Sequence, residues 1–282
     1  MVARNVLRIV LRIVLPGRFA ASACALRAGC ESQAIGGDLA RVFLTAQWRY
    51  LAMLNYQVAP ELLLPLVPEG TELDLWHGAA YISVVGFLFV DTRVLGAPIP
   101  FHRTFEEVNL RFYVRRQVDG ESLRGVTFIR ELVPRSAIAF VARLAYNEPY
   151  QALRMHHHIE RSAAPGAPSI RVAYEWTGAT GRAGIDLTAN GEPCPLSSGS
   201  LEEFITEHYW GYTRQRDGAT VEYEVRHPRW MVWNASSARL HGRLADVYPT
   251  PFAAELDRPP DCAFLADGST VAVHAPVRIS PR

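Results

Sequence analysis

The sequence contains no lysine: all 29 of its basic residues are arginine, and they face 28 acidic residues. Arginine in place of lysine, together with abundant alanine, is typical of a protein from a GC-rich genome. The formal net charge is +1, and no segment gathers basic residues on one face, which argues against a nucleic-acid-binding surface. Because 49% of the residues are hydrophobic, the chain can form a core, and extensive disorder is excluded.

Cysteine is also scarce. The chain has four cysteines, Cys24, Cys30, Cys194 and Cys262, and no two of them form a CxxC motif. So few thiols in a chain of this length do not indicate a disulfide scaffold, and their spacing does not fit a structural zinc site. We therefore expect unpaired thiols, a reducing cytoplasmic location and no bound metal.

The sequence lacks a hydrophobic run that could cross a membrane as a helix. The apolar stretch Val6–Leu15 is interrupted by Arg8 and Arg12, whereas a spanning helix needs about 20 largely uncharged residues. An arginine-rich, acid-poor segment is also compatible with a transit peptide or a helix on a membrane surface. We favour a poorly ordered extension over residues 1–40, followed by a single domain over residues 41–282.

From residue 41 onward the pattern is typical of a β-rich globular domain. Tyr81–Val90 is a continuous apolar run, which predicts a strand buried on both faces, and Gly86 indicates a bend or bulge in it. Glu106–Arg116 alternates between apolar and polar residues, as a strand with two different faces does. Further strands are predicted at Val126–Leu132, Ile170–Trp176, Gly184–Thr188, Thr220–Val225 and Trp230–Trp233.

Helices are few in this pattern. Short helices are predicted at Pro60–Leu66 and at Ser136–Tyr146, where alanines favour helix. A longer helix is predicted at Ser200–Thr213, because Ser200 and Glu203 form a capping box and apolar residues follow at helical spacing. Together these elements predict a mainly β, α+β fold: one barrel or sandwich that carries two or three helices.

The usual enzyme signatures are missing: the sequence has no GxSxG elbow, Walker loop or GxGxxG motif. The run His156-His157-His158 would place two imidazoles on one face of a strand, but no third ligand accompanies them, so we interpret it as a solvated strand. His208 lies on the apolar face of the predicted helix at Ser200–Thr213. A core histidine is the simpler interpretation of His208, and a catalytic base is the alternative.

The alternating strand at Glu106–Arg116 carries Glu107, Asn109 and Arg111 on one face. On a solvated sheet these would be ordinary surface residues. In a barrel they would line the interior, where a carboxylate and a guanidinium can orient an anionic ligand. The periodicity of the strand is compatible with both arrangements.

Several stretches resemble the YqjF-like bacterial family, a domain of unknown function. They include FHRTFEEVNLRFYVRR at residues 101–116, FIRELVPRSAIAFVARLAYNEPY at 128–150 and EEFITEHYWGYTRQRDG at 202–218, and the similarity extends over most of the chain beyond the N-terminal extension. That family is similar to the acetoacetate decarboxylase-like superfamily. The resemblance therefore implies a β-barrel or cone around an internal cavity.

The resemblance also carries a consequence for chemistry. When Pro149 is placed on the proline of the superfamily's Gly-Phe/Tyr-Pro-Lys motif, Tyr150 stands where the superfamily has its lysine, and Glu107 corresponds to its cavity glutamate. The superfamily's decarboxylases form a Schiff base through that lysine, which requires a neutral amine. Tyrosine cannot form an imine, and arginine stays protonated. The substitution therefore implies that Schiff-base decarboxylase activity is absent.

Three functions are compatible with this pattern. The first is a binding module that holds a small organic molecule, such as a carboxylate, in an internal cavity lined by Glu107, Asn109, Arg111 and Tyr150. The second is a lysine-independent enzyme, and the third is a structural or partner-binding protein. The sequence predicts no cofactor and no nucleic-acid partner, and it is compatible with a homo-oligomer.

In the enzyme hypothesis, acid–base chemistry on a small carbonyl compound replaces the Schiff base. Glu107 or Glu148 would be the general base and Tyr150 a proton donor, with His208 assisting. Proton abstraction next to a carbonyl group fits these residue types.

Overall fold

The computed structural model of the chain describes residues 42–98, 103–134, 147–162 and 168–279. The predicted N-terminal extension and the predicted helix at Ser136–Tyr146 lie outside these residues. The described part is mainly β with three short α-helices, as the sequence predicts. No helix in it is long and apolar enough to span a membrane.

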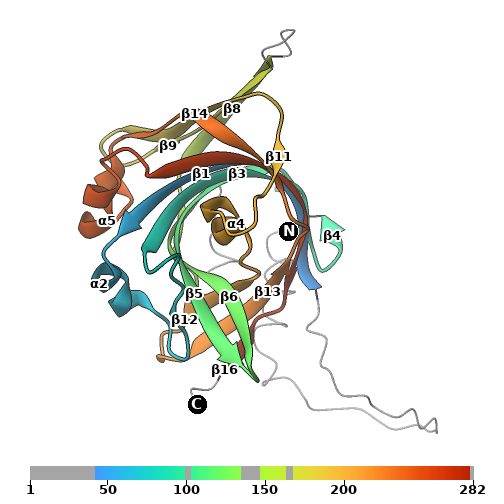
Figure 1. Cartoon of the computed structure of the whole chain (residues 1–282), viewed down its shortest axis with the longest axis vertical. Helices are drawn as coiled ribbons and strands as arrows, with labels where there is room; N and C mark the ends of the chain where they lie inside the picture. The colour runs from blue at the N-terminus through green and yellow to red at the C-terminus, as the bar shows by residue number, and fades with distance from the viewer. Residues whose placement is uncertain (1–41, 99–102, 135–146, 163–167, 280–282) are drawn as a thin grey trace, which may run out of the picture.

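A closed ring of strands forms the centre of the molecule (Figure 1). Its members, in chain order, are β1 (Val42–Val58), β3 (Ala80–Val94), β5 (Phe105–Val118), β6 (Glu121–Val133), β12 (Trp210–Arg214), β13 (Thr220–Arg226) and β15 (Cys262–His274). Hydrogen-bonded neighbours follow the order β13-β12-β6-β5-β3-β1-β15. A short antiparallel pairing between β13 and β15 then joins the two ends of this path.

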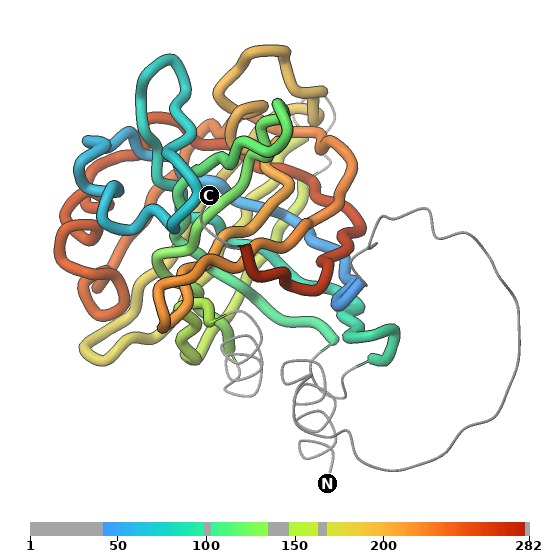
Figure 2. The backbone as a smooth tube through the Cα atoms, turned by 90° about the horizontal axis from the view of Figure 1, so that it is seen from below, coloured from blue at the N-terminus to red at the C-terminus, as the bar shows by residue number. Residues whose placement is uncertain are grey.

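The ring contains one pairing that joins distant parts of the sequence. Strand β12 pairs with β6 in parallel, through Trp210 opposite Gly125 and Gly211 opposite Val126. The view from below shows the green strands β5 and β6 running beside the orange strands β12 and β13 (Figure 2). This pairing brings residues near position 125 close to residues near position 210.

A second layer covers one outer side of the ring. It consists of β8 (Arg154–Ser162), β9 (Ser169–Thr177), β10 (Arg182–Asn190) and the C-terminal part of β14 (Met231–Gly242). Strand β14 connects the two layers, because it pairs first with β15 and then with β10. The outward-facing side chains Val108, Leu110 and Phe112 of β5 belong to the same core as Val172 and Ile185 of this outer sheet.

The irregularity predicted at Gly86 is present. The β1–β3 pairing shifts register between Arg49 and Ala52, and Ala52 lies opposite Gly86. A Cβ atom on Gly86 would lie 2.6 Å from the ring of Tyr174 in the outer sheet. Glycine at this position therefore allows the ring and the outer sheet to approach closely.

The three α-helices are short. Helix α2 (Pro60–Leu63) continues as a 3-10 turn (Leu64–Leu66), which agrees with the prediction, and α5 (Thr250–Glu255) packs beside the outer sheet. Helix α4 (Leu201–Thr206) lies inside the ring in Figure 1, and its Phe204 and Ile205 pack in the interior core. The remaining short elements are β2 (Glu72–Leu73), β4 (Ala97–Pro98), β7 (Tyr150–Ala152), β11 (Cys194–Pro195), β16 (Val277–Ile279) and a 3-10 turn (Leu244–Asp246).

The predicted helix at Ser200–Thr213 is half wrong. Its N-cap is confirmed, since the Ser200 hydroxyl accepts a hydrogen bond from the Glu203 amide. The helix ends at Thr206, and the following residues form β12. Gly211 explains the difference, because a Cβ atom there would lie 2.1 Å from the Tyr223 ring. Glycine at this position allows β12 and β13 to pack closely.

Candidate functional site

The polar face of β5 points into the ring and is buried. Glu107, Asn109 and Arg111 are 3%, 2% and 9% exposed, while the alternate residues pack outward against the second sheet. Of the two arrangements that the periodicity allows, the structure shows the interior one. These three side chains therefore place a carboxyl group, an amide and a guanidinium in the core of the molecule.

Two further glutamates and a tyrosine join this face. Glu131 lies opposite Asn109 on β6, and Tyr150 pairs with Glu131 at the start of β7. The Tyr150 hydroxyl donates to Oε2 of Glu107 at 3.3 Å, and the Asn109 amide donates to Oε1 of Glu107 at 3.2 Å. We call Glu107, Glu131, Glu148 and Tyr150 the carboxyl cluster.

Glu148 connects the cluster to the other side of the ring. Its Oε1 accepts hydrogen bonds from the Thr213 hydroxyl of β12, at 3.4 Å, and from the Tyr223 hydroxyl of β13. Glu148 is 5% exposed, and Tyr150 is 9% exposed. The cluster therefore depends on the parallel pairing that brings β12 beside β6.

The carboxyl groups of the cluster hold protons near neutral pH. Burial raises the pKa of Glu107 to about 8, with a smaller contribution from the negative charge of Glu148. Burial also raises the pKa of Glu148 to about 7 and that of Glu131 well above its ordinary value. The pKa of Tyr150 is raised by burial and by the surrounding carboxylates. The cluster can therefore donate protons as well as accept hydrogen bonds.

Several polar atoms around the cluster lack partners. Within the described residues, no hydrogen bond reaches Oδ1 of Asn109, Nε of Arg111 or Oε2 of Glu131, although all three atoms are buried. Arg111 donates one long hydrogen bond, from Nη2 to the Ile205 carbonyl at 3.4 Å, and its guanidinium lies 5.7 Å from the Tyr113 ring centre. Native proteins satisfy most buried polar atoms, so these three atoms need an explanation, such as a bound ligand.

His208 lies in a different polar group. Its Nε2 donates to Oδ2 of Asp74 at 3.0 Å, and the same oxygen accepts a hydrogen bond from Nε of Arg124 at 2.7 Å. Burial lowers the pKa of His208 to about 4, despite the opposing effect of Asp74. We call Asp74, Arg124 and His208 the Asp74 triad. None of the hydrogen bonds within the described residues joins His208 to the carboxyl cluster, which favours the core-histidine interpretation.

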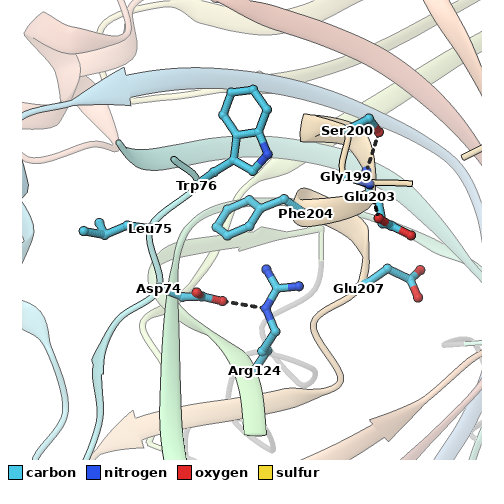
Figure 3. Close-up of a pocket in the computed structure, with 9 residues that line it drawn as sticks. All are labelled: Asp74, Leu75, Trp76, Arg124, Gly199, Ser200, Glu203, Phe204 and Glu207. Carbon is cyan, nitrogen blue, oxygen red and sulfur yellow. Dashed lines mark hydrogen bonds and ion pairs between the residues drawn. The ribbon is translucent and has the colours of Figure 1, made fainter. Parts of the chain in front are cut away.

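A pocket of about 450 Å³ lies beside the triad, between α4 and the segment that follows β2 (Figure 3). It is open to the surface on one side. Its lining residues are Asp74, Leu75, Trp76, Arg124, Gly199, Ser200, Glu203, Phe204 and Glu207. Sequence reasoning did not predict this pocket, because its two walls are far apart in the chain.

The histidine run and the thiols have unremarkable surroundings. On β8 the three histidines are exposed, and Nδ1 of His157 lies 2.6 Å from Oε1 of Glu106. In the part of the chain that the structure describes, no group of histidine, cysteine or acidic side chains is arranged to hold a metal ion. Cys194 and Cys262 are both free thiols.

Sequence reasoning missed Glu131, Thr213 and Tyr223. A signal for Glu131 was present in the Asp-Gly pair at residues 119 and 120, which is typical of a hairpin turn. This turn joins β5 and β6, and counting back from it brings Glu131 within one residue of Asn109. Thr213 and Tyr223 reach the site only through the parallel β12–β6 pairing, which has no local sequence signal.

Comparisons with known proteins agree with this architecture. A family described as an uncharacterized conserved protein, DUF2071, matches residues 45–270. The uncharacterized protein YqjF of Bacillus subtilis (strain 168) is 27% identical over 210 residues, which cover 71% of this chain and 79% of YqjF.

Two solved structures illustrate the fold that this chain shares. The enduracididine biosynthesis enzyme MppR complexed with pyruvate is 14% identical, with a TM-score of 0.59 over 88% of this chain and 94% of the other. Acetoacetate decarboxylase from Legionella pneumophila is 12% identical, with a TM-score of 0.54 over 92% of this chain and 98% of the other. The acetoacetate decarboxylase-like fold expected from the sequence is therefore confirmed.

Proposed function

The chain belongs to the DUF2071 family of uncharacterized conserved proteins, and we propose that its carboxyl cluster and Arg111 bind a small organic molecule that bears a carboxylate. The observation that carries this proposal is the burial of Glu107, Glu131, Glu148 and Arg111 in one place inside the ring, with polar atoms left without partners. Burying charged groups costs several kcal/mol for each ion, and well-packed apolar residues usually give equal or greater stability. This cost counts against a purely structural interior.

A carboxylate suits the charges of the site. No carboxylate within the described residues forms an ion pair with Arg111, whose planar guanidinium can pair with a carboxylate through two hydrogen bonds. The raised pKa of Glu107 makes that side chain a neutral hydrogen-bond donor rather than a repelling anion. The fold also accommodates such a molecule in MppR, which has been solved in complex with pyruvate.

Matched probes test the proposal. We would measure binding of pyruvate and other small 2-oxo acids by calorimetry and by shifts in melting temperature, each beside its uncharged amide, while mass spectrometry identifies any molecule that co-purifies. At least one acid should bind clearly more tightly than its amide. Arg111→Gln should weaken the binding of that acid about tenfold or more, as expected for a lost charged hydrogen bond. Arg115→Gln, on the same strand but outside the ring interior, is the control.

The opposite results would overturn it. If neither an acid probe nor a co-purifying carboxylate binds, or if Arg111→Gln and Arg115→Gln leave acid binding equally unchanged, then Arg111 does not hold a ligand carboxylate.

We further propose that the protein does not act as a Schiff-base decarboxylase. The chain has no lysine side chain to attack a ketone, and the resemblance to the superfamily aligns Tyr150 with its lysine. Incubation with acetoacetate followed by borohydride should leave the mass of the protein unchanged. A stable mass increase of one reduced acetoacetate adduct would refute this expectation.

A second function, acid–base catalysis on the bound molecule, is favoured by one observation. The pKa values of Glu148 and Glu107 are raised to about 7 and about 8, so both groups exchange protons near neutral pH, where general acid–base catalysis is most effective. The hydrogen bond from Tyr150 to Glu107 provides a second proton-carrying group.

Proton exchange in deuterated water tests this second function. An ionised glutamate would remove a proton from the carbon next to the ketone of pyruvate, which leaves an enolate and a protonated carboxyl group. After that carboxyl proton exchanges with the deuterated solvent, the same group would deliver a deuteron to the carbon and return to its ionised form. NMR should show loss of the methyl proton signal with wild-type protein and slower loss with Glu107→Gln. If a molecule that binds keeps its protons over a long incubation, the protein binds without turnover.

A further inference from the structure

The pocket beside α4 is a candidate for a second binding site. Its volume of about 450 Å³ lies within the range of small-molecule sites. It shares none of its lining residues with the carboxyl cluster or with Arg111. An occupant of this pocket would therefore contact a different set of side chains from the ligand proposed above.

Arg124 offers free hydrogen-bond donors to this pocket. Its Nε is bonded to Asp74, and its guanidinium lies 4.7 Å from the centre of the Phe204 ring. Its two terminal nitrogens have no partner among the described residues, and the side chain is 32% exposed. In Figure 3 these nitrogens point away from Asp74 and toward Phe204. A planar oxyanion such as a carboxylate suits this pair of donors.

The opposite edge of the pocket is acidic. Glu203 lies on α4 and Glu207 directly follows it, and Figure 3 shows both carboxylates on one side of the Arg124 guanidinium. Arg229 pairs with Glu203, and its Nε lies 3.8 Å from Glu207. One arginine therefore pairs with two carboxylates at this edge, so the edge keeps an excess of negative charge.

These charges select a ligand with both signs. A simple anion on Arg124 would meet repulsion from Asp74 and the acidic edge, whereas a simple cation at the edge would leave the Arg124 donors unused. A molecule with a carboxylate and an ammonium group can satisfy both. Trp76 and Phe204 add aromatic surface to the pocket, with Phe204 lying between Trp76 and Arg124 in Figure 3.

We propose that this pocket binds a free amino acid with an aromatic or large apolar side chain. Its carboxylate pairs with the terminal nitrogens of Arg124, and its ammonium group pairs with the edge formed by Glu203 and Glu207. Its side chain packs against Trp76. This site is independent of the carboxylate site proposed inside the ring.

Three probes of the same shape test the charge requirement. Calorimetry with the full chain would compare L-phenylalanine with 3-phenylpropionate, which lacks the ammonium group, and with phenethylamine, which lacks the carboxylate. We expect L-phenylalanine to bind and each analogue to bind at least about tenfold more weakly, because each loses one charged interaction. Equal binding of all three, or no binding of L-phenylalanine, overturns the proposal.

Matched variants then locate the site. Arg124→Gln and Trp76→Ala should each weaken L-phenylalanine about tenfold or more, whereas Arg115→Gln should not. Arg115 is a suitable control, because its Nε pairs with Glu72 at 2.8 Å much as Arg124 pairs with Asp74, yet it does not line the pocket. Trp76→Ala keeps the test decisive if Arg124→Gln fails to fold.

A variant inside the ring separates the two proposals. Glu107→Gln should leave L-phenylalanine binding unchanged. If Glu107→Gln or Arg111→Gln abolishes that binding while Arg124→Gln and Trp76→Ala do not, the amino acid occupies the ring interior. In that case the second site is refuted and the proposed function stands.

Discussion

The ring holds two buried polar groups whose carboxyl pKa values shift in opposite directions. In the carboxyl cluster, groups of like charge lie together, and burial raises the pKa of Glu107 and Glu148 toward neutrality. In the Asp74 triad, burial also opposes ionisation of Asp74, but hydrogen bonds from His208 and Arg124 outweigh it and hold the Asp74 pKa below its usual value. Asp74 is therefore charged where Glu107 is largely protonated.

The difference shows that the partners, and not burial alone, decide the charge state. Asp74 is 6% exposed and Glu107 is 3% exposed, so water reaches both poorly. Asp74 has a guanidinium at 2.7 Å, whereas Glu107 has an amide and a phenol as hydrogen-bond partners. A fixed ion pair suits a structural role, and a cluster that gains and loses protons near pH 7 suits chemistry.

The largest expected loss of stability comes from a substitution in the Asp74 triad. Asp74→Asn removes the charge that Arg124 and His208 share, and breaking a buried pair costs roughly 3–5 kcal/mol. Because Arg124 is 32% exposed and can be partly solvated, we expect the lower end, about 3 kcal/mol, in the free energy of unfolding by denaturant at pH 7.

Glu107→Gln is the matched control for that change. Glutamine resembles a protonated glutamate, so this substitution should alter the free energy of unfolding at pH 7 far less than Asp74→Asn does. Equal losses in the two variants would contradict the proposed contrast between charged and protonated carboxyl groups.

The next effect concerns the pH dependence of stability. The pKa of Glu107 rises from 4.5 in the unfolded chain to about 8, so the folded state keeps a proton that the unfolded state has lost. Its contribution to stability is therefore complete at low pH and is lost as the pH rises through 8. Below pH 8 this contribution falls by about 1.4 kcal/mol per pH unit, so between pH 6.5 and 8.5 Glu107 alone should account for a loss of about 2 kcal/mol in the free energy of unfolding.

His208 has the opposite pH dependence. Its pKa falls from 6.5 to about 4 in the fold, so its contribution is lost as the pH falls from 6.5 to 4, and it does not change above pH 7. The two groups can therefore be separated by pH. Glu107→Gln should reduce the loss of stability at alkaline pH by the contribution of one titrating group. If the free energy of unfolding changes with pH as it does in the wild type, Glu107 is already ionised in the fold.

The sequence predicted local features of the carboxyl cluster correctly. The alternation of β5 placed Glu107, Asn109 and Arg111 on one face, and the structure confirms that they share it. Their burial could not be predicted, because it follows from closure of the ring through β13 and β15, which pair across nearly 50 residues of sequence (Val225 with Val273).

The errors came from long-range pairing as well. Residues His208, Tyr209 and Tyr212 follow α4 at helical spacing, which extended the predicted helix, yet they belong to an extended segment that pairs with β6. Gly211 was the available warning, since glycine in a helix interior costs about 1 kcal/mol. The Asp74 triad was not predicted, because its members come from three separate parts of the chain.

The smallest expected effect sharpens the comparison by moving the same ion pair to the surface. Arg115 and Glu72 repeat the geometry of Arg124 and Asp74, with an Nε–carboxylate distance of 2.8 Å, but their side chains are 42% and 55% exposed. Exposed ion pairs contribute about 0–1 kcal/mol, so Glu72→Gln should change the free energy of unfolding by less than about 1 kcal/mol. Raising the salt concentration should reduce even this difference, whereas the loss in Asp74→Asn should persist because that carboxylate is buried. If Glu72→Gln proved as costly as Asp74→Asn, the geometry of the pair rather than its burial and its bond to His208 would account for the stability of the triad.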